Sequence, residues 1–353
     1  MKITYVVRRF GPVGGMERYV WETVLALSRQ GHDLTVLCER CEQPTPAGVS
    51  IHRLGEAFPR PRWLALLRFG ARVRRWLEDN PDPGRIVHSH ERLACHHLTT
   101  YHGPPFATIF ERPWWRWISL RVAMQLFLER RELSVAQPIV PVSFFIRDQI
   151  AHYYPQWAPK LSRPVLPGVL PGRPRENREV PAHGGIVGFV GKEWRRKGLD
   201  FAVQVVAQLR QRRPQLEFHV IGADPAEVQH LFKDWTSGYR LIPWSGDVPY
   251  ATLDLLLHPA RAEPFGMVIT EAMSARLPVV VSDRCGAAQE VSQDAGSVLP
   301  LNSSVEQWAE AVERQLSRPD PVPLYERSWD QVATEYVDLY QHIHSQRQGR
   351  GAN

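Results

Sequence analysis

This sequence lacks the features that mark secreted and membrane-spanning proteins. Its 353 residues include four cysteines, which fits a reducing compartment better than a disulfide framework. No uncharged apolar run reaches the roughly 18 residues that a membrane-spanning helix needs. The opening residues MKITYVVRRF do not form a signal peptide, because Arg8 and Arg9 interrupt their short apolar run. We therefore expect a cytoplasmic protein.

Signatures of cofactors and metals are also scarce. Cys38 and Cys41 form a C-x-x-C pair, but no second pair completes a zinc site. We interpret them as small residues near a strand end. The histidines between residues 88 and 102 show no sharp metal-ligand spacing. No G-x-G-x-x-G follows the first predicted strand, and no D-x-D stretch follows any strand. We expect neither a metal nor a cofactor.

Charge, by contrast, is present and unevenly distributed. The net charge is +6, with +9 in the first 170 residues and −3 in the remainder. A basic excess in one half favours an anionic partner for that half, such as a phosphorylated substrate, a membrane surface or nucleic acid. The apolar share of 43% is that of a globular protein. The length predicts two domains.

A strand–helix–strand pattern occurs in both halves of the chain. ITYVV (3–7) predicts a buried strand, a helical pattern then runs to Gly31, and DLTVLCE (33–39) predicts the next strand. The pattern restarts at GIVGFVG (185–191), after a linker rich in proline and glycine. Such units imply parallel sheets, so we predict an α/β protein of two Rossmann-like domains facing a cleft. The predicted segments are 1–165, 166–324, a closing helix at 325–345 that crosses back to the first domain, and a tail at 346–353.

Polar motifs follow the predicted strands, where ligands of parallel sheets bind. GKEWRRKG (191–198) places four cations beside a helix start, an arrangement that suits a diphosphate. A solvated basic loop is the alternative interpretation. Gly14 and Gly15 follow the first strand and would let an anion approach the backbone, although a purely structural turn explains them equally well.

Two glutamates lie on either side of another predicted helix start. RAEPFGMVITEA (261–272) follows a buried strand and holds Glu263 and Glu271. The first amides of the helix would offer unpaired donors to a phosphate, and the two carboxylates would then bind the hydroxyls of a nucleotide sugar. A general acid–base pair, as in glycoside hydrolysis, and a capping residue with a buried structural glutamate also fit this spacing.

Together these motifs resemble family 4 glycosyltransferases of the GT-B fold over almost the whole chain. The two glutamates match that family's E-x7-E motif, VGGMER its N-terminal glycine loop and GKEWRRKG its phosphate loop. GKEWRRKGLD and LLLHPARAEPFG most resemble the lipopolysaccharide-core α-glucosyltransferases. Two departures stand out: Gly191-Lys192 replaces the usual Gly-Arg, and the linker LPGV lacks the usual asparagine.

The resemblance implies a retaining, metal-independent hexosyltransferase. Its donor would be a nucleoside diphosphate sugar, expected to be UDP-linked. Its acceptor would be a lipopolysaccharide-core or other lipid-linked or phosphorylated glycan at the inner membrane face. The catalytic roles would fall to Glu263, Arg196, Lys197 and His102. Donor binding would fall to Gly15, Lys192, Arg240, Leu241, Ile242, Pro264, Phe265, Gly266, Met267, Val268 and Glu271.

Two basic segments of the first half suggest a surface for a further partner. Residues 60–79 and 112–132 predict basic amphipathic helices with tryptophan, which are typical of membrane surfaces. An acceptor phosphate or ordinary packing of the apolar side on the core would explain them too. The residues concerned are Arg68, Arg72, Arg75, Trp114, Trp115 and Arg116. Nucleic acid is the least favoured partner, because no known nucleic-acid module is present.

Two other functions fit the sequence less well. One is a nucleotide-sugar epimerase, a phosphorylase or another GT-B-type enzyme. The other is a non-catalytic binder of anionic surfaces.

Overall fold

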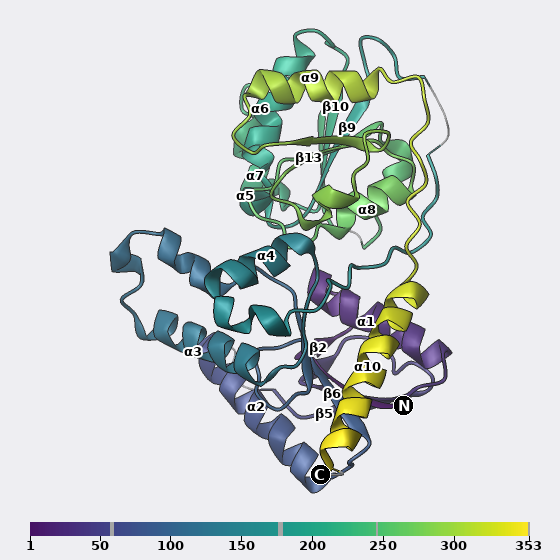
Figure 1. The fold of residues 1–353 in the computed structure, drawn as a ribbon. Helices are drawn as coiled ribbons and strands as arrows, with labels where there is room; N and C mark the ends of the chain where they lie inside the picture. The colour runs from purple at the N-terminus through teal and green to yellow at the C-terminus, as the bar shows by residue number, and fades with distance from the viewer. Residues whose placement is uncertain (57–59, 176–178, 245, 352–353) are drawn as a thin grey trace. The chain divides into compact units, whose positions relative to one another are not determined.

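The computed structural model describes residues 1–56, 60–175, 179–244 and 246–351 and divides the chain into two compact units. The first unit comprises Met1–Gly168 and Arg327–Asn353, and the second comprises Val169–Glu326. The division after Gly168 lies close to the boundary predicted after residue 165. Both units are parallel α/β folds (Figure 1), which confirms the predicted fold class.

The first unit is built on six parallel strands in the order β5-β3-β1-β6-β7-β8. Apolar residues fill β1, where Ile3, Tyr5 and Val6 are buried, because helices cover a parallel sheet on both faces. The strands are β1 (Lys2–Val6), β3 (Asp33–Cys38), β5 (Val49–Arg53), β6 (Arg85–Ser89), β7 (Leu98–Tyr101) and β8 (Ile139–Pro141). The helices are α1 (Gly15–Arg29), α2 (Arg62–Asp79), α3 (Leu120–Val135) and α4 (Phe144–Tyr153).

The second unit repeats this architecture with strands in the order β11-β10-β9-β12-β13-β14. Its core packs Trp308 against the inner strands, where Phe189 and Phe218 are fully buried. The strands are β9 (Ile186–Val190), β10 (Glu217–Ile221), β11 (Tyr239–Ile242), β12 (Leu255–His258), β13 (Val279–Ser282) and β14 (Gly296–Leu299). The helices are α5 (Trp194–Lys197), α6 (Leu199–Arg210), α7 (Pro225–Val228), α8 (Met267–Ser274) and α9 (Val305–Leu316).

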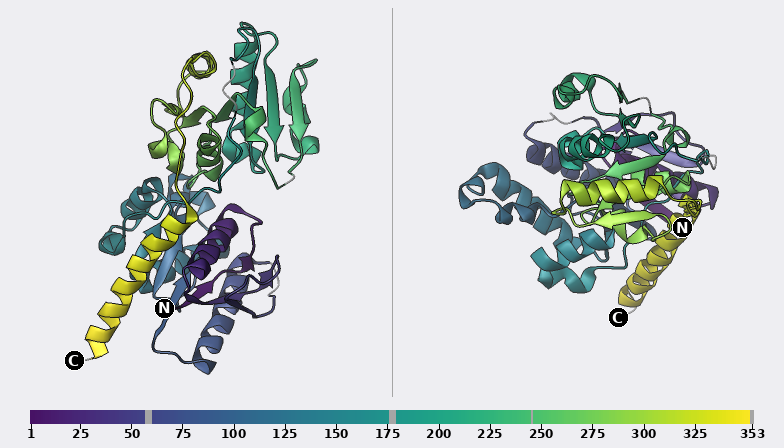
Figure 2. Two further views of the ribbon diagram at one scale, coloured as in Figure 1. Left: turned by 90° about the vertical axis from the view of Figure 1, so that its right-hand side faces the viewer. Right: turned by 90° about the horizontal axis from the view of Figure 1, so that it is seen from above.

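The last helix, α10 (Trp329–Gly351), belongs to the first unit. It lies alongside α1 (Figures 1 and 2). Its buried residues Val332, Tyr336, Tyr340 and Ile343 recur every three or four positions and so form one face. The helix continues through residues 346–351, which the sequence analysis had assigned to a tail; residues 352–353 lie outside the described part. Within the described ranges, no helix is both long and apolar enough to cross a bilayer.

A chain of buried hydrogen bonds joins α10 to the sheet of the first unit. The Tyr340 hydroxyl lies 2.7 Å from both the Tyr5 hydroxyl and Nδ1 of His88. Nε2 of His88 lies 2.7 Å from the Thr100 hydroxyl, which lies 2.6 Å from the hydroxyl of Tyr336. Loss of any one hydroxyl would leave a buried partner without its bond.

We predict that Tyr336→Phe lowers the free energy of unfolding by about 1–3 kcal/mol, because Thr100 and Tyr19 lose a buried partner. Urea denaturation would measure the change. Thr334→Ala, on the exposed side of the same helix, is the matched control and should change stability much less. Equal stability of the Tyr336→Phe variant and the parent would contradict the structural role of the chain.

Candidate functional site

The two motifs of the second unit lie at the same edge of its sheet. Strands β9 and β12 are parallel neighbours, so the loops that follow Val190 and His258 emerge side by side. The first loop leads into α5, and the second leads through Glu263 to α8. A backbone hydrogen bond of 2.9 Å from Arg261 to the Arg196 carbonyl joins the two loops. The sheet topology thus brings together segments that lie about 65 residues apart.

Gly191 makes room for the side chain of Lys197. Its φ of 150° is one that residues with a side chain rarely adopt, and an added Cβ would lie 2.2 Å from Cδ of Lys197. The aliphatic part of the lysine therefore lies directly against this backbone. Its ammonium group is directed to the buried carboxylate of Glu263, at 3.2 Å.

Glu263 is a buried carboxylate with cationic neighbours. Its Oε2 lies 3.2 Å from both Nη1 of Arg196 and Nζ of Lys197, and 3.6 Å from Nε2 of His258. Burial alone would raise the pKa of Glu263, but Lys197, His258 and Arg196 outweigh burial and hold that pKa well below its usual range. The residue is therefore ionised at neutral pH.

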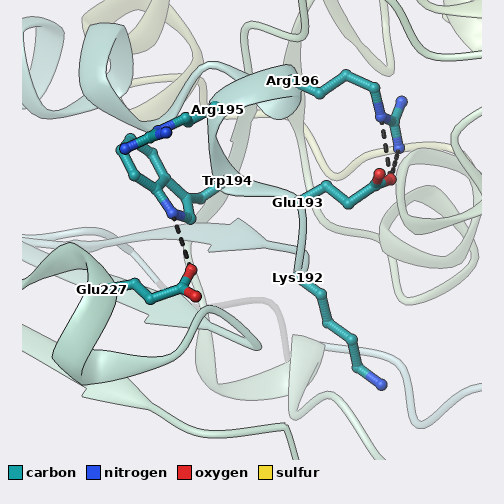
Figure 3. Close-up of a pocket in the computed structure, with 6 residues that line it drawn as sticks. All are labelled: Lys192, Glu193, Trp194, Arg195, Arg196 and Glu227. Atoms are coloured by element: carbon teal, nitrogen blue, oxygen red, sulfur yellow. Dashed lines mark hydrogen bonds and ion pairs between the residues drawn. The ribbon is translucent and has the colours of Figure 1, made fainter.

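Arg196 connects this carboxylate to the solvent-facing part of the loop. Its Nη1 also donates to the Ala262 carbonyl at 2.6 Å, while Nε and Nη2 donate to Oε2 of Glu193 at 3.0 and 2.6 Å. Figure 3 shows the side chains of Arg196 and Glu193 pointing toward each other. The guanidinium group is thereby fixed in place, with its charge shared between two carboxylates.

A cavity of about 550 Å³ opens beside this loop (Figure 3). Trp194 forms part of its wall and donates from Nε1 to Glu227 at 3.3 Å, while the Arg195 guanidinium lies over the indole ring. Lys192 extends in another direction (Figure 3), with Nζ 4.9 Å from the centre of the Trp244 ring. Cations and aromatic faces together suit a ligand that carries both negative charge and a flat ring.

Helix α8 begins directly beside Glu263. Gly266 precedes it with a φ of 96°, and an added Cβ would lie 3.1 Å from Cγ of Glu263. The amides that open the helix have no acceptor within it, as at every helix start. Glu271 lies one turn further on and accepts a hydrogen bond of 2.7 Å from the Tyr250 hydroxyl. Pro264, Phe265, Met267 and Val268 complete this turn.

The remaining predicted donor-site residues lie elsewhere. Arg240, Leu241 and Ile242 are in β11, and Arg240 is paired with Glu217 at 3.4 Å. Gly15 and His102 belong to the first unit, at the start of α1 and after β7. His102 is only partly exposed, and burial of its ring lowers its pKa to about 3. Its Nε2 lies 2.7 Å from Nδ1 of His90.

Sequence reasoning missed four contributors: His258, Glu193, Tyr250 and Trp244. A signal exists for His258, because it is a polar residue at the end of the apolar run LDLLLHPA, the position at which ligands of parallel sheets bind. Glu193 lies inside the cationic motif GKEWRRKG, whose spacing gives no sign that its one carboxylate binds Arg196. The parts played by Tyr250 and Trp244 depend on tertiary contacts with Glu271 and Lys192, which leave no local pattern.

The proposed basic surface of the first unit needs two corrections. Arg72 does not face solvent freely: it donates to the carbonyls of Leu54 and Gly55 at 3.1 and 2.6 Å and pairs with Glu39 at 3.1 Å. Residues 112–132 do not form one helix, because the side chain of Ser119 caps a new one, α3. Trp114, Trp115 and Arg116 form a separate short 3₁₀ turn and are exposed, as are Arg68 and Arg75 on α2.

Comparison with known proteins identifies the family. Residues 13–169 match the model "Glycosyltransferase Family 4", and residues 184–318 match "Glycosyl transferases group 1". The crystal structure of WaaG, a glycosyltransferase involved in lipopolysaccharide biosynthesis, superposes with a TM-score of 0.76 at 20% identity and covers 98% of both chains. This chain belongs to the glycosyltransferases of the GT-B fold.

Individual relatives of this glycosyltransferase are distant. The lipopolysaccharide glucosyltransferase WaaG of Escherichia coli K12 is 29% identical over 212 residues, which are 55% of either chain. The chain spans about half the length of the first curated relatives that it matches, WaaG at 55% and a D-inositol 3-phosphate glycosyltransferase of Corynebacterium aurimucosum at 54%. Anabaena HepE in complex with UDP-glucose has a TM-score of 0.60 at 15% identity and covers 100% of this chain and 99% of its own.

The depressed pKa of Glu263 predicts how stability depends on pH. The ionised carboxylate stabilises the fold fully above its unfolded pKa of about 4.3, and this contribution is lost as the pH falls further. Between about pH 5 and pH 3, the free energy of unfolding of Glu263→Gln should fall less steeply than that of the parent, by up to about 1.4 kcal/mol per pH unit.

Urea denaturation across this pH range tests the expectation. Glu78→Gln, which replaces an exposed carboxylate on α2, is the control and should keep the slope of the parent. Parallel curves for the parent and Glu263→Gln would show that the buried cluster does not stabilise the ionised carboxylate.

Proposed function

We propose that this protein transfers a hexose, with retention of configuration, from a nucleoside diphosphate sugar to a glycan acceptor. The observation that carries the proposal is the pair of cations, Arg196 and Lys197, at a buried carboxylate beside the opening amides of α8. A departing diphosphate develops negative charge, and fixed cations and helix-start amides stabilise such charge. The match to two glycosyltransferase family models supports the same chemistry.

The carboxylates then have binding roles rather than proton-transfer roles. Glu263 is held ionised by cations, whereas a general acid needs a raised pKa. We assign Glu263 to the donor hexose and Glu271, oriented by Tyr250, to the ribose hydroxyls. Lys192 and Trp244 would border the nucleoside. No metal is assigned to the donor site, because the cations and amides already supply positive charge to the diphosphate.

UDP is the proposed nucleotide of the donor, and the support is comparative. Anabaena HepE, which shares the fold, binds UDP and UDP-glucose. A lipopolysaccharide-core or related lipid-linked acceptor follows from the likeness to WaaG of Escherichia coli. Such an acceptor would place the protein on the cytoplasmic face of the inner membrane.

An exposed aromatic segment of the first unit supports contact with a membrane. Trp114 and Trp115 are 62% and 63% exposed, and Ile118 and Leu120 are 72% and 68% exposed. Arg112, Arg116 and Arg121 lie among them and are exposed too. Apolar side chains with interspersed arginines suit an anionic lipid surface, where each cation contributes about 1 kcal/mol.

We predict that Lys197→Met lowers kcat/KM for the sugar donor on the order of 100-fold, because it removes one fixed cation from the leaving diphosphate. A thermal-shift panel of nucleotide sugars would first identify the donor, and coupled detection of released UDP would then measure turnover. Lys233→Met, an exposed lysine of the same unit, should retain the activity of the parent.

Three outcomes would redirect the proposal. Unchanged donor kinetics in Lys197→Met would remove the phosphate role of this lysine. If the nucleotide sugar is converted to an epimer when no acceptor is present and no UDP is released, the protein is an epimerase. A protein that binds no member of the panel is not a glycosyltransferase of this kind.

We predict that the double substitution Trp114→Ser and Trp115→Ser weakens binding to vesicles containing phosphatidylglycerol about tenfold or more. Sedimentation with vesicles at low and high salt would measure the partition, since the arginine contribution is screened by salt. Leu324→Ser, at an exposed apolar residue of the second unit, is the control. Equal partition of the double variant and the parent would rule out this segment as a membrane contact.

A further inference from the structure

His258 is a fully buried polar residue next to Glu263. It ends β12, is fully buried, and its ring stacks at 6.2 Å on Phe189. Within the described part of the chain, neither of its ring nitrogens has a hydrogen-bond partner. Its Nε2 nevertheless points to Oε2 of Glu263, 3.6 Å away. A buried polar ring that forms no other contact of this kind calls for a functional explanation.

The protonation of this pair follows from its surroundings. Burial lowers the pKa of His258 to about 4, so the ring is neutral at pH 7. The groups that face Glu263 are Arg196 and Lys197 from α5, His258 from β12 and Cys285 from the loop after β13, whose buried thiol has a pKa raised to about 12. A carboxylate only accepts hydrogen bonds, so a bond between the two groups requires the neutral tautomer with its proton on Nε2.

A bound diphosphate would reduce the positive charge around the carboxylate of Glu263. The two cations now at Oε2 are the groups that the proposed function assigns to the donor diphosphate. A diphosphate therefore competes with Glu263 for Arg196 and Lys197. As the cations turn toward the phosphates, the carboxylate remains buried with less positive charge around it, and burial then favours its protonated form. A protonated Glu263 could no longer offer two acceptor oxygens to a sugar.

A neutral histidine is not subject to this competition. His258 carries no charge that attracts a diphosphate, and its burial keeps it beside Glu263. At 3.6 Å the contact is longer than a formed hydrogen bond, and a shift of a few tenths of an ångström toward the ring would close it. One bond to Oε2 would leave Oε1 for a hydroxyl of the sugar.

We propose that His258 is a positioning residue that donates from Nε2 to Glu263 and keeps this carboxylate ionised and oriented while the donor diphosphate occupies Arg196 and Lys197. The inference rests on the proposed function, because it requires a diphosphate at these cations. It assigns His258 no contact with the substrate.

Proton uptake on ligand binding tests this role. UDP-glucose is the probe, since its diphosphate is esterified at both ends and takes up no proton near pH 6. Calorimetric titration in two buffers of different ionisation enthalpy yields the number of protons taken up. The parent should take up none at Glu263. His258→Leu, which has no donor, should take up a measurable fraction of a proton more, whereas the side-chain amide of His258→Gln should restore the result of the parent.

The pH dependence of turnover provides a second readout. Loss of a hydrogen bond to a charged group in the bound complex should move the acidic limb of kcat, measured at saturating donor, about one to two pH units upward in His258→Leu and much less in His258→Gln. His219→Leu replaces another buried histidine of this unit, whose ring lies 2.8 Å from Glu217 rather than beside Glu263. It should leave both readouts unchanged.

The outcomes separate the two proposals. Equal proton uptake and equal acidic limbs in the parent, Leu and Gln proteins would overturn the role of His258 while leaving the glycosyltransferase proposal intact. If the His258 variants fail to fold, proton uptake by the parent on binding UDP-glucose still tests the inference. Uptake of about one proton by the parent, abolished in Glu263→Gln, would refute it. Failure of the parent to bind any nucleotide sugar would overturn the proposed function and this role with it.

Discussion

The second unit is organised around one costly arrangement, a carboxylate removed from water. A buried charge is tolerated only where opposite charges or donors compensate it. Compensation for Glu263 comes from Arg196 and Lys197, which must therefore reach inward from α5. Gly191, which has a positive φ and no Cβ, leaves the space that the side chain of Lys197 occupies. The same cluster holds two cations at defined positions, which is the arrangement that the proposed diphosphate contact requires.

Two buried polar clusters, one in each unit, differ in how fully they are hydrogen-bonded. In the first unit, the hydroxyls of Tyr5, Tyr340, Thr100 and Tyr336 and the imidazole of His88 are joined in a continuous chain of hydrogen bonds. Around Glu263, neither ring nitrogen of His258 has a hydrogen-bond partner among the described residues, and the cations and the ring lie 3.2 to 3.6 Å from Oε2 of the carboxylate. A satisfied network is rigid, whereas an unsatisfied one retains the capacity to bind.

Much of this arrangement could be predicted from sequence, because its signals are local. Buried strands appear as apolar runs, and the rule that ligands bind at strand ends selected Lys197, Glu263 and Glu271. The ion pairs of Arg196 and Lys197 with Oε2 of Glu263 could not be predicted. They depend on how closely two loops that are about 65 residues apart in the sequence approach each other. Arg72 is the clearest error: helical periodicity placed it on a basic face, but periodicity does not reveal that carbonyl groups lie within reach. Ser119 interrupted a pattern that looked continuous, because a serine side chain can start a new helix.

The position of α10 has a consequence for how the protein is made. The first unit consists of two stretches of chain, and the second unit is inserted between them. Because domains fold as the ribosome delivers them, the part that begins first cannot be completed until residues after Arg327 have emerged. The second unit is one contiguous stretch of chain and can fold on its own before then. Until Tyr336 and Tyr340 have been synthesised, the hydroxyls of Tyr5 and Thr100 cannot form their hydrogen bonds to α10. The core of the first unit therefore needs residues that are translated after the whole second unit.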